Sequence, residues 1–436
     1  MGGERTWPAL YGFAPAPATL RAMAPARYPV MMSRSPASLL NALFDAALAA
    51  AQPATCLPPY LPEPPPGGRT VVVGLGKAAA TMAEAVEAHY PGPISGVVVC
   101  PYGAARPLRQ LRLIEAGHPV ADDNSMAAAT AILAAVRGLA AQDLVIALIS
   151  GGGSALAALP VAGVTLAEKT QVVGELMRAG APIEALNHLR AALSRFKAGG
   201  LLRAIGPARC LSLLISDVVG DDPAVIASGP TVPRAIDPAN VMTTLADHGV
   251  VPPRSVADHL RTMAPQPLRP PPPSSEVRLI ATPRMALDAA AARARAMGLH
   301  PRILSDALVG DPAAAARAHL AAAATMAAGE ALLSGGELTT VVQTRPGKGG
   351  PNLEFCLELV AQGLPPGLHA LAADTDGRDG NSGVAGAVVS AATPAAGAAE
   401  ALARSASFDY LSQHAEIVDP GWTGTNVNDF RAMLKL

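Results

Sequence analysis

Short apolar runs alternate with alanine-rich segments along most of this 436-residue chain. The runs 70–73, 96–100 and 144–149 have the length of buried strands, and each is followed within two residues by glycine or proline. Alanine is the best helix former, so the segments between these runs are predicted as helices. Strands that alternate with helices favour a doubly wound, largely parallel sheet. We therefore predict an α/β fold with a Rossmann-like sheet and a second α/β domain.

Proline-rich stretches indicate where the domains divide. A chain of this length commonly forms two or three domains. The stretch 265–273 is rich in proline, and a new series of strands and helices follows it from about Arg278. The predicted parts are an N-terminal extension over 1–34, a Rossmann-like domain over 35–264, a linker over 265–275 and a C-terminal α/β domain over 276–436.

The composition excludes several classes of protein. Half of the residues are hydrophobic and 15% are charged, which excludes a disordered chain. A net charge of -1 leaves no basic excess for nucleic acid or anionic lipid, and 3% aromatic residues do not favour base stacking. The four cysteines form no CxxC pair, and no apolar run has the roughly 18 residues of a membrane span. We expect a cytoplasmic protein that binds neither nucleic acid nor membrane; a homodimer stays open.

The first polar turn is GLGKAAA, which follows the apolar run 70–73. Gly74 and Gly76 permit a tight turn and a close approach of an anion to the backbone. The turn also fits the loose dinucleotide pattern GxGxx(G/A), but the next strand ends in Pro-Tyr-Gly without the carboxylate that would bind a ribose. Lys77 is not required by the dinucleotide pattern, and it places a cation where an anion would bind.

Two further segments carry donors for anions. Ser150, Gly151, Gly152, Gly153 and Ser154 follow the strand 144–149, and successive glycines expose backbone N–H groups that suit phosphate or carboxylate. The segment is not a P-loop, because the GK[ST] ending is missing. On a predicted helix, Asn187, Arg190 and Ser194 share one face, which Lys197 continues.

Carboxylates and small polar residues gather in the remaining turns. Asp217, Asp221 and Asp222 follow a strand in a glycine-containing turn, and oxygen ligands of this kind suit magnesium. Asp is also common in turns for local hydrogen bonding, so a single one of them could be structural. The further candidates are Ser228, Gly229, Thr231, Gly335, Gly336, Glu337, Gly349, Gly350, Asn352, Asp374, Asp376, Thr425, Asn426 and Asn428.

These stretches resemble the class II glycerate 2-kinase family, whose C-terminal part is called the MOFRL domain and some of whose members are labelled hydroxypyruvate reductase. The similarity runs in family order from about Ser35 to the C-terminus. The matching stretches are VVVGLGKAAATMAEAVE, EAGHPVADDNS, LISGGGSAL, SDVVGDDPAVIASGPTVP, LSGGELTTVV, ADTDGRDG and TGTNVNDFRAML.

The resemblance implies ATP as co-substrate, magnesium as cofactor and an active site in the cleft between two domains. It places Lys77 at the substrate or the transferring phosphate. We expect Arg190 and Lys197 to offset negative charge and Asp217 to orient the attacking hydroxyl group. The magnesium ligands implied are Asp221, Asp222, Asp374 and Asp376. The glycines, hydroxyls and amides of the turns above, with Glu337, are the expected binding residues for substrate and nucleotide.

The chain departs from the family pattern at several positions. Ala191 and Ala192 replace a lysine and a histidine, Pro351 replaces an arginine, and Ala104 ends a segment that usually reads RYGH. These changes remove positive charge or hydrogen-bond donors, and phosphoryl transfer depends on electrostatic stabilisation. The favoured function is ATP-dependent phosphorylation of D-glycerate to 2-phosphoglycerate. The alternatives are an NAD(P)H-dependent hydroxypyruvate reductase and a weakened or non-catalytic ligand-binding descendant.

Overall fold

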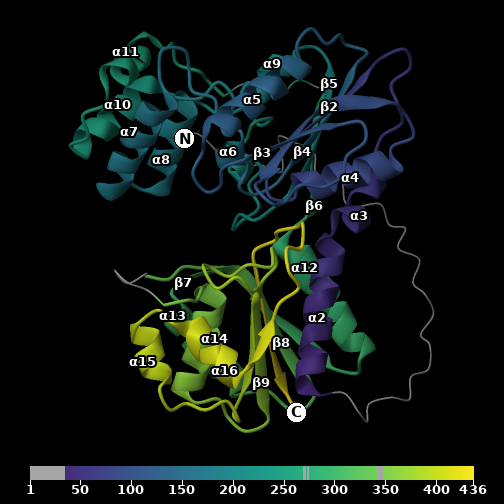
Figure 1. Cartoon of the computed structure of the whole chain (residues 1–436), viewed down its shortest axis with the longest axis vertical. Coiled ribbons are helices and arrows are strands. Elements are labelled where there is room, and N and C mark those ends of the chain that lie inside the picture. Colours follow the sequence, from purple (N-terminus) through teal and green to yellow (C-terminus); the bar gives the residue numbers. More distant parts are fainter. Residues whose placement is uncertain (1–34, 269–271, 273, 342–346) are drawn as a thin grey trace, which may run out of the picture. The chain divides into compact units, whose positions relative to one another are not determined.

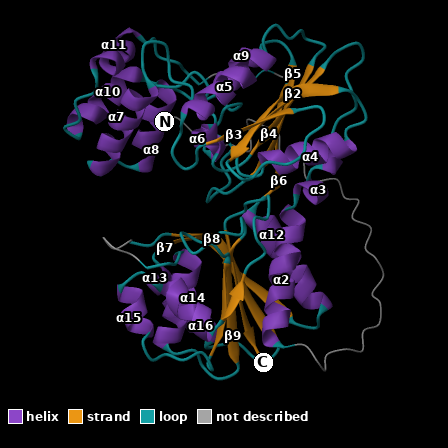
Figure 2. Ribbon diagram, in the orientation of Figure 1, coloured by secondary structure: helices purple, strands orange, loops and turns teal. Residues whose placement is uncertain are grey.

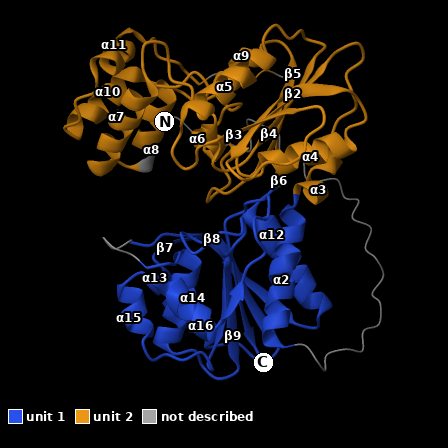
Figure 3. Ribbon diagram, viewed as in Figure 1, with its two compact units in different colours: residues 1–52, 281–436 blue, residues 53–280 orange. Residues whose placement is uncertain are grey.

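The computed structural model of the chain describes residues 35–268, 272, 274–341 and 347–436. The predicted extension over 1–34 lies outside them. The described residues form two compact units (Figure 3). We call residues 53–280 the central unit, and residues 35–52 with 281–436 the terminal unit.

The central unit alternates strands with helices, as predicted (Figure 1). Its elements are α3 (Pro53–Cys56), η1 (Pro58–Tyr60), β1 (Thr70–Leu75), α4 (Ala79–His89), β2 (Ile94–Pro101), β3 (Arg112–Ala116), α5 (Asp123–Ala135), β4 (Leu144–Ile149), α6 (Gly153–Leu156), α7 (Leu166–Arg178), α8 (Ile183–Ala192), α9 (Gly200–Ile205), β5 (Arg209–Ile215), η2 (Ile226–Ser228), α10 (Pro238–Asp247), α11 (Arg254–Thr262) and β6 (Ser275–Ala281).

The central sheet has the strand order β3-β2-β1-β4-β5-β6, and its strands from β3 to β5 pair in parallel. Every residue of β1 and β4 is buried, as expected for strands covered on both faces. Leu75 pairs with Ile149, and Ile149 pairs with Leu214, so the carboxyl ends of β1, β4 and β5 are level. Ligands of such sheets bind beyond this edge.

A group of helices in the central unit has its own apolar core. Apolar residues of α7, α8, α10 and α11, among them Val172, Leu189, Leu245 and Leu260, pack together. Figure 1 shows these four helices beside one another. No helix within the described ranges of either unit has the length and hydropathy needed to cross a membrane.

The terminal unit is a second α/β layer structure (Figure 2). Its elements are α2 (Pro36–Ala51), α12 (Pro283–Ala296), β7 (His300–Gly310), α13 (Pro312–Ala323), β8 (Glu330–Leu338), α14 (Pro351–Gln362), β9 (Leu368–Asp374), β10 (Gly386–Ser390), α15 (Ala398–Ala403), α16 (Ser407–His414), β11 (Glu416–Val418) and β12 (Asp429–Lys435). The sheet order is β11-β10-β9-β12-β8-β7, with β12 antiparallel to both neighbours. Helices α2 and α12 cover one face, and α13 and α14 cover the other (Figure 2).

The observed units differ from the predicted domain boundaries in two places. The prediction assigned 35–52 to the first domain, but α2 belongs to the terminal unit, because its apolar face packs against α12 and β12. The prediction began the second domain at 276, but β6 completes the central sheet beside β5. Both errors arise because the boundaries depend on contacts between residues far apart in sequence, which cannot be predicted from local composition.

Phe44 on α2 tests this corrected boundary. Its side chain is buried, and its ring centroid lies 5.7 Å from that of Phe430 on β12. Phe44→Ala is expected to destabilise the terminal unit by about 3–5 kcal/mol, because it leaves a cavity between helix and sheet. Urea unfolding followed by circular dichroism measures the change. Asp45→Ala, at an exposed position of the same helix, should change stability by about 0.5 kcal/mol or less; equal effects of the two substitutions would contradict the packing.

Candidate active site

Two turns at the carboxyl edge of the central sheet are joined by direct hydrogen bonds. The backbone N–H of Lys77, after β1, donates to the carbonyl oxygen of Gly151, after β4, over 2.8 Å. The N–H of Ala78 donates to Ser150 Oγ over 3.0 Å. Gly76 has a φ of +131°, and a methyl group there would lie 2.2 Å from Ser150 Oγ. Glycine is therefore required for the two turns to approach this closely.

Polar side chains from the turn after β1 and from two further segments lie against the glycines that follow β4. A methyl group on Gly151 would lie 1.5 Å from Asp217 Oδ2, so the carboxylate of Asp217 rests on the Gly151 backbone. A methyl group on Gly152 would lie 2.8 Å from His118 Nε2 and 3.3 Å from Lys77 Cγ. The sequence predicted that Lys77 and the turn beginning at Asp217 meet, and the structure places both beside this loop.

Lys197 is hydrogen-bonded to the end of the same loop. Its Nζ donates to Ser154 Oγ, and Ser154 Oγ lies 3.0 Å from Ser228 Oγ. Backbone bonds hold the two segments together: Ala198 N–H donates to Ser228 O over 3.0 Å, and Gly199 N–H donates to Gly229 O over 2.8 Å. Lys197 is 5% exposed. Burial first, and then the charges of neighbouring cations, lower its pKa well below the usual lysine value.

Unusual backbone conformations concentrate in these segments. Ala198, Asp221, Ala227 and Ser228 have φ values of +50°, +53°, +50° and +63°. Each left-handed conformation of a residue other than glycine costs on the order of 1–3 kcal/mol and is retained where the surroundings enforce it. Strained residues of this kind are typical of functional sites, which agrees with the predicted role of the turns.

A cavity of 460 Å³ opens beside Lys197. It is bounded by Gly152, Ser154, Arg190, Lys197 and a second lysine, Lys169. Arg190 donates to Asn187 Oδ1 over 3.3 Å, as their helical spacing predicts. The described residues that line the cavity include no carboxylate. Three basic side chains without an acidic partner in the wall suit an anionic ligand, because the charge of such a ligand favours their protonated forms.

The aspartates after β5 could hold a divalent cation only in part. Asp222 Oδ1 accepts the N–H of Ala224 over 2.8 Å, which leaves its other oxygen for a ligand. Among the described residues no group of three or more His, Cys, Asp or Glu side chains is placed to hold a metal ion. Magnesium commonly takes one or two carboxylates together with substrate phosphates and water. One or two of the carboxylates of Asp217, Asp221 and Asp222 could therefore hold magnesium that arrives with a phosphate group.

The predicted residues of the second half gather at one edge of the terminal sheet. Asp429, at the start of β12, pairs with Asp374 at the end of β9 and with Gly336 near the end of β8. Glu337 follows Gly336 at an exposed position. Beyond Asp374, the Asp376 N–H donates to Asp374 Oδ1 over 2.9 Å. The predicted metal ligands are thus divided, with Asp221 and Asp222 in the central unit and Asp374 and Asp376 in the terminal unit.

The polar loop before β12 is also buried at this edge. Asn428 N–H donates to Asn426 Oδ1 over 3.0 Å, and Thr425 Oγ1 donates to the Ala51 carbonyl over 2.7 Å. The buried Asn428 Nδ2 has no hydrogen-bond partner within the described ranges. A buried amide donor left unpaired is costly, so Asn428 is a position where a ligand oxygen would bind favourably.

Asn352 lies in a network that supports the fold. Buried Asp379 accepts hydrogen bonds from the N–H groups of Asn352 and Leu353 over 3.0 and 2.8 Å, which caps the start of α14. Asn352 Nδ2 also donates to Asp429 Oδ1 over 2.6 Å, and Asp429 pairs with buried Arg431. Burial raises the pKa of Asp379 to about 7, and the two N–H bonds oppose this shift.

Two close contacts extend this network to the predicted glycines. A methyl group on Gly350 would lie 2.4 Å from Asp379 Cγ, and Gly349 N–H donates to Asn381 Oδ1 over 2.8 Å.

In the central unit Thr231 is buried and accepts a hydrogen bond from Ser212 over 2.8 Å. Thr425, Thr231 and the side-chain nitrogen of Asn352 therefore make hydrogen bonds within the protein, whereas the buried Asn352 Oδ1 has no hydrogen-bond partner among the described residues.

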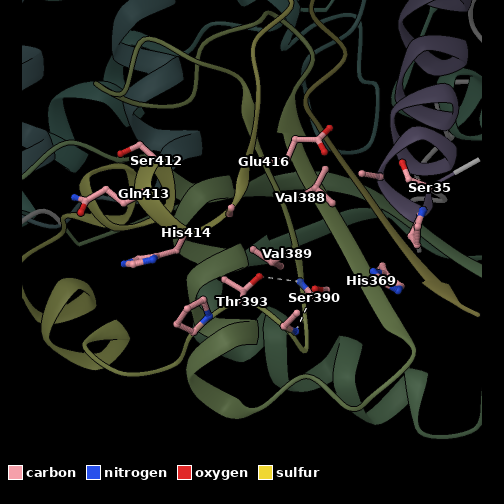
Figure 4. A pocket seen from close by; sticks show the side chains of 15 residues that line it. Ser35, His369, Val388, Val389, Ser390, Thr393, Ser412, Gln413, His414 and Glu416 are labelled. Carbon is pink, nitrogen blue, oxygen red and sulfur yellow. Dashed lines mark hydrogen bonds between the residues drawn. The ribbon is translucent and has the colours of Figure 1, made fainter.

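A separate hollow of 690 Å³ lies in the terminal unit (Figure 4). Figure 4 shows His369, Ser390, His414 and Glu416 around it. His369 pairs with Ser390 near the start of β9, whereas Asp374 ends the same strand. This hollow is therefore at the sheet edge opposite Asp374, and none of the predicted site residues lines it.

Comparison with known proteins identifies the family to which this two-unit fold belongs. Residues 39–261 match a family described as "Domain of unknown function (DUF4147)", and residues 330–429 match the MOFRL family. The chain is 33% identical to the D-glycerate 2-kinase of Thermotoga maritima, over 83% of this chain and 89% of that protein. The chain belongs to the class II glycerate kinase family.

A solved structure and a further relative extend the comparison. A crystal structure of a glycerate kinase from Thermotoga maritima superposes with a TM-score of 0.82 at 31% identity, and covers 92% of this chain and 100% of that one. A protein of Agrobacterium vitis named "Putative hydroxypyruvate reductase" is 43% identical over 91% of this chain and 94% of that protein. The fold and family predicted from the sequence are confirmed.

The departures from the family pattern lie in packed positions. Ala191 and Ala192 are buried in the core of the helical group, and Ala104 is buried after β2. A lysine or histidine there would need space that these small side chains leave to their apolar neighbours. Pro351 is the first residue of α14, where proline is favoured because its missing N–H is not needed.

Sequence reasoning missed two residues at the central site, His118 and Lys169. His118 lies in EAGHPVADDNS, but an isolated histidine has no ligand spacing to single it out. Lys169 carried a signal that was overlooked. It lies three and seven residues before Val172 and Leu176, the buried stripe of α7. A lysine within the apolar face of an amphipathic helix is unusual and points to a special environment.

Two glycines near the cavity should respond to alanine in opposite directions. Gly151→Ala forces the Asp217 carboxylate to move, so we expect a loss of about 1–3 kcal/mol of stability. Gly174→Ala on α7 adds a methyl group in open space, and it should stabilise the fold by about 0.5–1 kcal/mol through helix propensity. Urea unfolding of both variants measures the changes. Equal tolerance of the two substitutions would contradict the contact between Gly151 and Asp217.

Proposed function

We propose that the chain transfers the γ-phosphoryl group of ATP to the 2-hydroxyl group of D-glycerate. The observation that carries this proposal is the convergence of Lys77, Asp217 and Lys197 on the glycine loop after β4. Family membership supports the same activity, because relatives at 32–33% identity are named glycerate kinases. A cavity with basic side chains beside the glycine loop after β4 suits a substrate and a co-substrate that are both anionic.

In this proposal different basic side chains bind different negatively charged groups of the substrates. Arg190 and Lys197 offset the charge of the carboxylate or phosphate groups in the cavity. Lys77 lies against Gly152, which lines the same cavity, and there it stabilises negative charge on the transferring phosphoryl group. Such preorganised charges stabilise the transition state because they need little rearrangement during the reaction.

Asp217 is the proposed positioning group for the hydroxyl nucleophile. The hydroxyl oxygen forms a bond to the γ-phosphorus, the bond from that phosphorus to the β–γ bridging oxygen breaks, and the hydroxyl proton is released. The products are 2-phosphoglycerate and ADP. A carboxylate fixed against the Gly151 backbone can accept the hydroxyl hydrogen bond and hold the oxygen in line.

Magnesium is proposed at the oxygen donors of Asp217, Asp221 and Asp222. When bound with ATP, the ion would neutralise charge on the phosphate oxygens. Asp374 and Asp376 of the terminal unit stay predicted ligands, and so does the predicted cleft between the units. Omission of magnesium, or excess EDTA, is expected to abolish turnover.

The rival reductase activity has one observation in its favour, the name of the relative at 43% identity. The strand β2 ends in Pro101-Tyr102-Gly103, without the ribose-binding carboxylate of nicotinamide enzymes. One set of assays separates the functions. ADP formation from D-glycerate and Mg-ATP, followed without nicotinamide coupling, supports the kinase; oxidation of NAD(P)H by hydroxypyruvate, without ADP formation, overturns it. Binding of glycerate and ATP without either turnover indicates the non-catalytic descendant.

Lys77→Met is expected to lower kcat about 10²–10³-fold, because it removes one charge that stabilises the transferring phosphoryl group. Lys435→Met provides a matched control. Lys435 is near the end of β12, and its Nζ donates to the Pro366 carbonyl over 3.2 Å. Steady-state kinetics and thermal unfolding of both variants are compared with the unsubstituted protein. A normal kcat for Lys77→Met would remove Lys77 from the proposed reaction.

A further inference from the structure

Lys169 is buried without a partner in the wall of the cationic cavity. It is 6% exposed, and its Nζ has no hydrogen-bond partner among the residues that the structure describes. Transfer of a charged ammonium group out of water is strongly unfavourable unless the charge is paired. A position of this kind is retained at a cost to stability, which indicates a ligand that supplies the missing partner.

The surroundings of Lys169 carry the same sign of charge. Arg190 of α8, and Lys197 and His118 from the loops, are the other titratable groups in the cavity wall. The carboxylates of the two helices, Glu168, Glu175 and Glu184, do not line it, nor does His188. Glu168 is bonded elsewhere, to Thr165 and Ser255. The cavity wall therefore holds no counter-ion for the protonated amine of Lys169, and an anion from solution can supply one.

The rest of the wall indicates what kind of anion fits. Val120, Leu166, Val173 and Met177 add apolar surface around the three cations. The volume of 460 Å³ is within the range of about 300–1,000 Å³ typical of sites for organic ligands. A small organic molecule with a terminal oxyanion matches this combination better than a bare inorganic ion.

We propose that Lys169 is a substrate-binding residue, whose ammonium group pairs in this cavity with an oxyanion of an organic substrate. The inference rests on the proposed function for the identity of the ligands, D-glycerate and ATP. The oxyanion is the carboxylate of the acid or a phosphate of the nucleotide. Lys169 acts together with Arg190 and Lys197, and Ser154 links Lys197 to the glycine loop where Lys77 and Asp217 lie.

Burial of Lys169 gives the proposal a pH signature. Burial, reinforced by the charge of Arg190, lowers the pKa of Lys169 to about 7. Above this pH the free protein carries a neutral amine, and the oxyanion binds the protonated form. Binding must then take up a proton, and affinity should fall as pH rises above 7, by up to about tenfold per pH unit.

Three variants separate ligand binding from a structural role. Lys169→Met keeps the apolar stem and removes the charge, so binding of one ligand should weaken about 10- to 100-fold while the melting temperature rises. Lys169→Arg keeps a permanent charge, so it should retain binding and reduce the pH dependence between 7 and 9; the pKa of Lys197 in the same cavity is also lowered, so this residue contributes the remainder. Lys435→Met removes a lysine elsewhere and should change neither property.

Calorimetry of the full chain at pH 7, 8 and 9 provides the test, with D-glycerate, Mg-ATP and inorganic phosphate as separate probes. Selective weakening of D-glycerate binding by Lys169→Met assigns the cavity to the carboxylate, and selective weakening of Mg-ATP binding assigns it to a phosphate. If Lys169→Met weakens the binding of inorganic phosphate alone, the cavity is an adventitious anion site and the proposal is overturned. Unchanged binding of all three probes by Lys169→Met also overturns it.

This readout does not depend on catalysis. If D-glycerate or Mg-ATP binds in a Lys169-dependent manner but no ADP forms, the inference stands and the proposed function fails. If ADP forms with unchanged KM values in Lys169→Met, the proposed function stands and the inference fails.

Discussion

The central site depends on the close approach of a carboxylate to a bare backbone. Asp217 rests on Gly151, and Lys77 and His118 flank Gly152, so a single side chain on this loop would separate the groups that it gathers. The hydrogen bond from Lys77 N–H to the Gly151 carbonyl fixes the two turns in register. Because β1, β4 and β5 are level at their carboxyl ends, the parallel sheet brings these turns to one edge, and the glycines allow the final contact.

The elements that could be predicted from sequence are those whose pattern is local. Buried parallel strands read as continuous apolar runs, which is why β1 and β4 were recognised. The strand β12 was missed, because Asp429 and Arg431 interrupt its apolar pattern. Only the fold shows that these two side chains pair with each other inside the sheet. The assignments of α2 and β6 failed for a related reason, since their partners lie far away along the chain.

The site residues that could be predicted from sequence are likewise those with a local signal, and those that could not be predicted depend on contacts far apart along the chain. Turns rich in glycine and aspartate were recognisable because backbone geometry selects those residues, and the structure brings those of the central unit together. The role of Asn352 could not be predicted, because it depends on Asp379 and Asp429, 27 and 77 residues away. Lys169 was not singled out, because a lysine on a helix is usually exposed to solvent; its burial on α7 becomes visible only in the fold.

The discontinuous terminal unit has a consequence for biosynthesis. Helix α2 emerges from the ribosome early, but the sheet that covers its apolar face includes β12, which is translated hundreds of residues later. The central unit is complete once β6 has been made, and domains generally fold as their residues appear. The nascent chain must therefore carry the apolar face of α2, with Leu40, Leu43 and Phe44, without its final partner until translation reaches β12.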